Sequence, residues 1–148
     1  MSGYKHVLCA TDFSLNSDRA CERAWELAQC FTADLTLLHV VEYFPEDRSN
    51  RTIAPEDIDP VEYRQQQAEQ QMAQQIERVG CGDANTRIIF STRSARHEVV
   101  PYAKANGVDL VVLSSHGRHG MHALLGSSAA GVLHQAECDV LAVRAKED

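Results

Sequence analysis

The chain has 148 residues and a formal net charge of −7, with 14 Lys plus Arg against 21 Asp plus Glu. Its length fits one domain of about 150 residues, and its 44% hydrophobic and 24% charged residues exclude a disordered or membrane-spanning chain. Lys and Arg supply most of the affinity for nucleic-acid backbones. Because acidic residues outnumber them here, we do not expect DNA or RNA as a partner. We therefore expect a single domain over residues 1–148.

The N-terminal segment lacks the features of a secretion signal. It has no apolar core or small-residue cleavage site, and no window of the chain is apolar for long enough to span a membrane. The cysteines of the chain are Cys9, Cys21, Cys30, Cys81 and Cys138. Their number is odd, no two of them have Cys-x-x-Cys spacing, and most lie in apolar stretches, so we expect reduced thiols in the core. These features predict a cytoplasmic protein without membrane contact.

Strand and helix patterns alternate along the chain. Short apolar runs predict buried strands at 6–10, 35–41, 86–91, 110–113 and 140–143. Apolar residues at three- and four-residue spacing predict helices after 14, after 59, after 96 and from about 128. A long polar loop with two prolines separates the second strand from the second helix. The alternation predicts an α/β fold, an open and doubly wound parallel five-stranded sheet with helices on both faces.

The second expected helix has the clearest terminal signals. Asp59 is its N-cap, Pro60 is its first residue and Gly80 ends it. We expect the glutamines between 65 and 75 to face solvent. The residues expected on its buried face are Ala68, Met72, Ala73, Ile76 and Val79. In the third helix, which closes at Asn106 and Gly107, Pro101 is expected to cause a kink or mark a late start.

Two strand ends carry residues suited to binding. In a doubly wound sheet, ligands bind beyond the carboxyl ends of the strands, where the strand order reverses. Asp12 lies just beyond the carboxyl end of the first expected strand. Its carboxylate could contact a ligand, or it could cap the next helix. The glycine-bearing segment 114–128 follows the fourth strand and opens a helix whose N–H groups favour anions, with Arg118 as a further phosphate contact. The sequence contains neither a P-loop nor a dinucleotide-binding fingerprint.

Three histidines at three-residue spacing, His116, His119 and His122, lie in the same segment. A zinc site needs three or four convergent ligands, and no carboxylate or Cys with ligand spacing lies beside them. We therefore expect solvated loop histidines and no metal. No catalytic site is expected either, because the chain has no Gly-x-Ser-x-Gly elbow and His39 is better interpreted as a strand-end residue than as a general base.

Several motifs together resemble the universal stress protein family over essentially the whole chain. They are Ala-Thr-Asp-Phe-Ser at 10–14, Leu-Leu-His-Val at 37–40, Ser-His-Gly-Arg-His-Gly at 115–120, Leu-Leu-Gly-Ser at 124–127 and Asp-Val-Leu-Ala-Val-Arg at 139–144. The resemblance implies a Rossmann-like fold of the adenine nucleotide alpha hydrolase type, with strand order 3-2-1-4-5. It also implies a stress-response protein that acts by binding and interaction, not as an enzyme.

The resemblance implies a site for an adenine nucleotide, ATP or AMP, with or without Mg²⁺. Asp12 and the backbone of Val40 would meet ribose and adenine, while the glycine segment would hold phosphates. The full set of expected site residues is Ala10, Asp12, Val40, Ser114, Gly117, Arg118, Gly120, Gly126, Ser127 and Ser128. Slow ATP hydrolysis or self-phosphorylation on Ser127 or Ser128 would be a side activity of a binding protein.

Two departures from the family pattern keep an alternative open. Nucleotide-binding members have Gly-x-x-Gly, nine residues and then Gly-Ser or Gly-Thr, whereas this chain has Ser114, Gly117 and eight residues before Gly126. The short spacing resembles the branch around universal stress protein A, whose best-known members do not bind ATP, although that branch lacks the glycines found here. The alternative to a nucleotide-responsive regulator is therefore a nucleotide-free dimeric interaction protein of that type.

The resemblance also implies a homodimer formed through the last strand, Val140 to Val143. An apolar strand at the edge of a sheet supports this physically, because an unpaired edge favours association with another chain. Further protein partners are not identified by the sequence.

Overall fold

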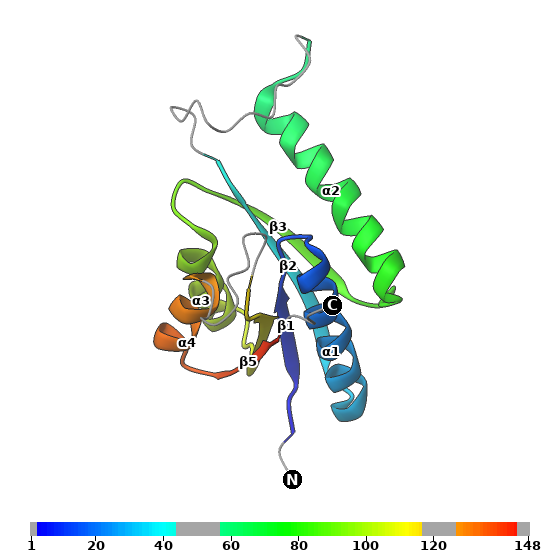
Figure 1. Ribbon diagram of the computed structural model, residues 1–148, viewed down its shortest axis with the longest axis vertical. Helices are drawn as coiled ribbons and strands as arrows, with labels where there is room; N and C mark the ends of the chain where they lie inside the picture. The colour runs from blue at the N-terminus through cyan, green and yellow to red at the C-terminus, as the bar shows by residue number, and fades with distance from the viewer. Residues whose placement is uncertain (1–2, 44–56, 117–126, 145–148) are drawn as a thin grey trace.

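The computed structural model describes residues 3–43, 57–116 and 127–144. Within these residues strands and helices alternate, beginning and ending with a strand (Figure 1). The elements are β1 (His6–Ala10), α1 (Leu15–Phe31), β2 (Asp34–Glu42), α2 (Pro60–Val79), β3 (Asn85–Ser91), α3 (Ala95–Ala105), β4 (Leu110–Ser114), α4 (Ser127–Gln135) and β5 (Asp139–Val143). The predicted order of elements is confirmed.

The strands form one parallel sheet in the order β3-β2-β1-β4-β5. At its centre, Cys9 of β1 aligns with Leu37 of β2 on one side and with Val112 of β4 on the other. The chain winds outward from β1 through β2 to β3 and then returns to place β4 against the free side of β1. The doubly wound fold is therefore confirmed, and the strand order reverses between β1 and β4.

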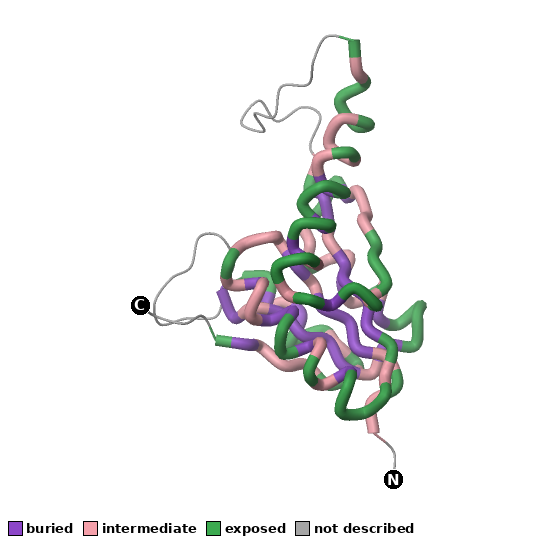
Figure 2. Tube along the Cα trace, turned by 90° about the vertical axis from the view of Figure 1, so that its right-hand side faces the viewer, coloured by how far each residue is buried: buried purple, intermediate pink, exposed green. Residues whose placement is uncertain are grey.

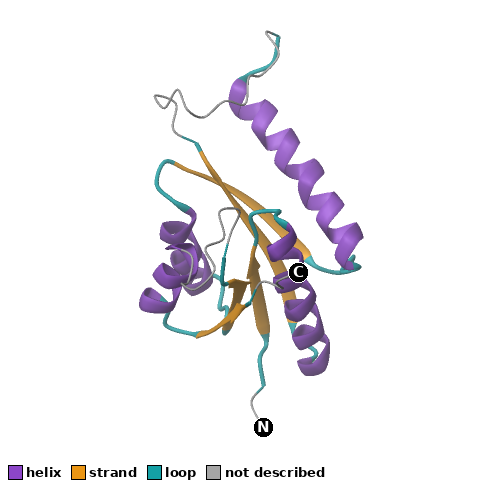
Figure 3. Cartoon of the chain, viewed as in Figure 1, coloured by secondary structure: helices purple, strands orange, loops and turns teal. Residues whose placement is uncertain are grey.

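Helices cover both faces of the sheet, α1 and α2 on one face and α3 and α4 on the other (Figure 3). Successive side chains of a strand point to opposite faces. Accordingly, Val7 and Cys9 of β1 pack with residues of α1, whereas Leu8 packs with residues of α3 and α4. All three are fully buried. This double coverage explains why the strands are unbroken apolar runs in the sequence.

The helix boundaries follow the sequence signals. Asp59 caps the first turn of α2, Pro60 is its first residue, and Gly80 ends it with a φ of 81°. The first turns of α2 extend beyond the sheet, and none of residues 60–67 is buried (Figure 2). Pro101 lies inside α3, which begins at Ala95, so this proline does not delay the start of the helix. Within the described residues, no helix is long and apolar enough to cross a membrane.

The buried face of α2 includes a glutamine. Ala68 and Met72 are buried as predicted, but Ala73 is exposed and Gln75 is fully buried, so the prediction was wrong at these two positions. The Gln75 amide donates a hydrogen bond to the Asp18 carboxylate of α1 at 2.9 Å. Because a buried amide needs hydrogen-bond partners, this polar contact from α1 makes a glutamine suitable at an otherwise apolar interface.

Three cysteines belong to the core between the sheet and helices α1 and α2. Cys9, Cys21 and Cys81 are fully buried, Cys138 is half-buried and Cys30 is exposed. The predicted burial is therefore confirmed for three cysteines and wrong for Cys30, which lies on a solvent-facing position near the end of α1.

Burial of Cys81 makes the stability of the fold depend on pH. Burial, with a smaller contribution from the neighbouring Cys21, raises the pKa of Cys81 from 9.0 to about 11. The folded chain therefore keeps a proton that the unfolded chain loses, so the free energy of unfolding falls as the pH rises from about 9 to about 11. We expect Cys81 to contribute a loss of about 2 kcal/mol by pH 11.

Urea unfolding at pH 7, 9, 10 and 11 under reducing conditions measures this loss. Cys81→Ala is expected to be less stable than the wild type at pH 7, because the substitution leaves a small cavity. It is also expected to lose less stability between pH 9 and pH 11. Parallel losses in the two proteins over that range would contradict the prediction.

Candidate functional site

The candidate site lies at the carboxyl ends of β1 and β4, which are neighbours at the point where the strand order reverses. In an open α/β sheet this is the place where ligands bind. Beyond the two strands, the side-chain amide of Asn16 donates to the carbonyl oxygen of His116 at 3.5 Å. This contact joins the start of α1 to the segment after β4. The structure therefore brings Asp12 and Ser114 to the same edge of the sheet.

The segment after β1 is held by its own side chains. The backbone N–H of Phe13 donates to Thr11 Oγ1 at 3.0 Å, and that of Ser14 donates to Asp12 Oδ1 at 2.9 Å. Ser14 is the N-cap of α1 and accepts the backbone N–H of Ser17. Asp12 is therefore not the helix cap, which was one of its two expected roles. Its carboxylate instead accepts the Ser14 N–H and closes the turn that follows β1.

Phe13 adopts an unusual backbone conformation at this turn. Its φ of 65° lies in the left-handed region, which is strained for a residue with a side chain. Its ring stacks on His39 of β2 with centroids 4.0 Å apart, and His39 Nδ1 donates to the carbonyl oxygen of Thr11 at 2.8 Å. His39 thus supports the turn. Sequence reasoning missed Phe13, whose one signal was its place directly after Asp12.

The two other expected residues on this side lie in the sheet itself. Ala10 is the last residue of β1 and is half-buried. Val40 of β2 has a buried side chain and aligns with Ile89 of β3. Since the Val40 side chain is buried, its expected contact with a ligand would have to be made by the backbone.

At the end of β4, the Ser114 side chain is bonded to the backbone that follows it. Its hydroxyl donates to the carbonyl oxygen of His116 and accepts the backbone N–H of the same residue at 3.2 Å. The N–H of Ser115 donates to the carbonyl oxygen of Val143, which continues the pairing of β4 with β5. A glycine at 114 could not make the first two bonds, so the serine fixes the conformation of this segment.

His116 is buried, so its prediction as a solvated loop histidine was wrong. Its Nδ1 lies 3.1 Å from Ser115 Oγ, while its Nε2 has no hydrogen-bond partner among the residues that the structure describes. His119 and His122 lie outside those residues. Across 3–43, 57–116 and 127–144, no group of three His, Cys, Asp or Glu side chains could hold a metal ion.

The remaining expected site residues belong to the segment that leads into α4. Ser127 and Ser128 are exposed in the first turn of that helix. Backbone N–H groups in a first helical turn favour anions such as phosphates. The other four predicted residues lie outside the described part of the chain and stay predictions; they are Gly117, Arg118, Gly120 and Gly126.

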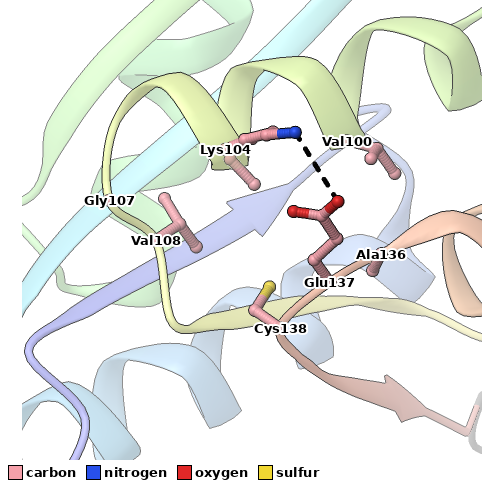
Figure 4. Close-up of a pocket in the computed structure, with 8 residues that line it drawn as sticks. Val100, Lys104, Gly107, Val108, Ala136, Glu137 and Cys138 are labelled. Carbon is pink, nitrogen blue, oxygen red and sulfur yellow. Dashed lines mark ion pairs between the residues drawn. The ribbon is translucent and has the colours of Figure 1, made fainter.

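A separate pocket of about 220 Å³ lies between the end of α3 and the start of β5 (Figure 4). Lys104 Nζ and Glu137 Oε1 approach each other to 3.6 Å beside it. Its residues Val108 and Cys138 precede β4 and β5, so it lies at the amino ends of the strands, opposite the candidate site. The pocket contains none of the predicted site residues and is smaller than a typical site for a drug-sized ligand, about 300 Å³ or more.

Comparison with known proteins gives a consistent result along the whole chain. The model of the universal stress protein family matches residues 3–144. Universal stress protein A homolog 2 from Coxiella burnetii is 36% identical over 147 residues, which cover 99% of each chain. The structure of universal stress protein UspA from Lactobacillus plantarum is 26% identical with a TM-score of 0.73, covering 97% of this chain and 100% of that one.

A second solved structure is that of a universal stress protein in complex with cAMP. It is 26% identical with a TM-score of 0.64, and the match covers 96% of this chain and 98% of that one. Both structures share the overall fold of this chain. From the family match and the full-length relatives, this chain belongs to the universal stress protein family.

Proposed function

We propose that this protein is a cytoplasmic stress-response regulator that binds an adenine nucleotide, ATP or AMP, at the carboxyl ends of β1 and β4. The observation that carries the proposal is that Asp12 and Ser114 lie at the carboxyl ends of two neighbouring strands, β1 and β4, where the strand order reverses. A relative that is 26% identical was solved with cAMP, which is itself an adenine nucleotide. The protein acts by binding and not by turnover.

The charges of the site suggest how the ligand lies. The carboxylate of Asp12 suits hydroxyl or amino donors of a nucleoside and would repel a phosphate. The first turn of α4, with Ser127 and Ser128, suits the phosphate end. Because the chain carries a net charge of −7, phosphates must be held by local groups such as these N–H donors and Arg118.

A nucleotide bound at this site could regulate the protein through the conformation of segment 114–128. The ligand would contact segments that follow two different strands, and it would favour the conformation of segment 114–128 that contacts it best. A change in that conformation alters the surface that a partner protein meets. Mg²⁺ would accompany ATP at the phosphates.

We also propose a homodimer formed through β5. This strand is an edge of the described sheet, and the apolar side chains at 140–142 are only half-buried. Pairing with a second copy would cover them and satisfy the exposed strand edge. Light scattering at micromolar concentration is expected to give twice the mass of the 16.4 kDa chain. A mass of one chain at every concentration tested would contradict the dimer.

A second candidate function is a nucleotide-free dimeric interaction protein. The hydroxyl of Ser114 favours it, because this hydroxyl already bonds to the N–H and carbonyl of His116. Those backbone groups are then engaged within the protein. The eight-residue spacing from Gly117 to Gly126 favours the same function.

Calorimetry with ATP, ADP and AMP, with and without Mg²⁺, separates the two functions. We expect the wild type to bind with weak to moderate affinity and Ser114→Gly to bind ATP several-fold more tightly, since it frees the backbone of His116. Adenosine, which lacks phosphates, should bind both proteins equally. The absence of heat at millimolar nucleotide in both proteins would overturn nucleotide binding and leave the interaction protein.

A further inference from the structure

The core beneath the candidate site contains two thiols in direct contact. Sγ of Cys9 in β1 and Sγ of Cys21 in α1 are 3.1 Å apart, and both residues are fully buried. At this separation one thiol donates a hydrogen bond to the other. A disulfide requires about 2.05 Å between the sulfurs, so they must approach by about 1 Å. Both lie on packed elements that already hold the pair together.

We propose that Cys9 and Cys21 form an oxidative modification site at which hydrogen peroxide oxidises the two thiols to a disulfide. In the first step, one sulfur attacks the O–O bond and becomes a sulfenic acid, and one water is released. In the second step, the other thiol displaces the sulfenic hydroxyl, which leaves as a second water while the S–S bond forms. Two thiols lose two electrons in total, and one peroxide is reduced to two waters.

Burial selects the oxidant. Neither sulfur is exposed to solvent, so a bulky disulfide such as oxidised glutathione cannot reach the pair in the folded chain. A small neutral peroxide can enter through local openings of the structure. Cys30 is exposed and would react with both classes of reagent. The pair and Cys30 therefore differ in a way that an experiment can detect.

The contact between the thiols also sets the rate. The hydrogen bond between Cys9 and Cys21, together with burial, favours the protonated form of Cys9 and raises its pKa well above the ordinary value. The Cys9 thiolate is therefore scarce at neutral pH, and because its fraction rises tenfold per pH unit below the pKa, its oxidation should be slow at pH 7 and about thirtyfold faster at pH 8.5.

The position of the pair gives the disulfide a structural consequence. It would close a loop from β1 to α1 that contains the whole turn at 11–14, including Asp12. Oxidation would thus tie together the two elements that hold this turn, which lies at the ligand edge of the sheet. The disulfide itself does not depend on nucleotide binding.

Peptide mapping tests the proposal on the full chain. Reduced protein is treated with hydrogen peroxide under native conditions, its remaining thiols are alkylated in denaturant, and trypsin is added without reductant. Cleavage after Arg19 separates Cys9 from Cys21, and the five cysteines fall on five different tryptic peptides. We expect the cross-linked pair of peptides 6–19 and 20–23 at a yield at least tenfold above that of any other pair.

Two variants serve as matched controls. Cys21→Ala should lose the cross-link, whereas Cys81→Ala, which changes another fully buried cysteine of the same cluster, should keep it. Oxidised glutathione should modify Cys30 and leave the pair reduced. Near-UV circular dichroism checks that the wild type stays folded during the treatment, and the loss of the Cys30 thiol shows that peroxide has reacted. The proposal is overturned if no Cys9–Cys21 disulfide is found at that point. A disulfide between Cys81 and either cysteine of the pair, at a yield equal to that of the Cys9–Cys21 disulfide, would also overturn it.

Discussion

Replacement of Leu37 by alanine is expected to lower the free energy of unfolding by about 3–4 kcal/mol. Leu37 lies in β2, next to the central strand, and is fully buried in the core cluster that joins the sheet to α1. Its loss removes apolar contacts and leaves a cavity that the rigid sheet cannot fill. Urea unfolding measures the change as a lower midpoint with the same slope, because the unfolded chain exposes nearly the same surface.

Leu15→Ala is the matched control for this prediction. Leu15 is also a leucine, but it is 81% exposed at the first position of α1. We expect its replacement to change the free energy of unfolding by less than about 0.5 kcal/mol. If Leu37→Ala lowered the free energy of unfolding no more than Leu15→Ala does, this result would contradict the burial of Leu37 between the sheet and α1.

Asp12→Ala is expected to weaken AMP binding about a hundredfold, which corresponds to about 2.7 kcal/mol. The substitution removes a charged acceptor at the carboxyl end of β1, where we propose that the nucleotide binds, and hydrogen bonds to charged groups are worth about 1.5–3 kcal/mol. It also removes the acceptor for the Ser14 N–H, so the turn before α1 is less well fixed. Calorimetric titration with AMP measures the loss.

Two further aspartate variants distinguish the causes. Asp12→Asn keeps an oxygen for the Ser14 N–H without the charge, so we expect an intermediate loss of about tenfold. Asp109 accepts the backbone N–H groups of Lys5 and His6 at the opposite end of the sheet. Asp109→Ala should therefore destabilise the fold without changing AMP affinity. Equal affinities of the wild type and Asp12→Ala would show that the ligand does not contact this carboxylate.

The fold could be predicted from the sequence because its elements are defined by local patterns. The apolar run at Leu110 to Leu113 and the capping residues Asp59 and Gly80 are each sufficient to place an element. The alternation of strands and helices then restricts the topology to a doubly wound sheet. The strand order came from the family resemblance, and the structure confirmed it.

Two of the residues that were predicted wrongly, Gln75 and His116, lie at contacts between segments far apart in the sequence. Gln75 is buried because Asp18, 57 residues earlier, accepts its amide hydrogen bond. His116 is buried where the segment after β4 meets Asn16 of α1. In each case a local pattern identifies a polar residue, but only the packed structure shows that it lies where two segments far apart in the sequence meet.

The sequence predicted that Asp12 lies beyond the carboxyl end of the first strand, and the structure has it there. The sequence could not decide between ligand contact and helix cap for this residue. Ser14, two residues later, is the N-cap of α1, which leaves Asp12 in the preceding turn. The contact between Cys9 and Cys21 was not predicted, since it depends on how α1 packs against β1.

A titration of ¹⁵N-labelled protein with AMP, followed by amide chemical shifts, tests the central claim most directly. We predict saturable shifts for residues 11–14 and 114–116 and at Ser127 and Ser128. Amides around the pocket at the opposite end of the sheet, such as those of Lys104 and Cys138, should not move. No shifts at millimolar AMP, or shifts confined to that pocket, would contradict adenine-nucleotide binding at the carboxyl ends of β1 and β4.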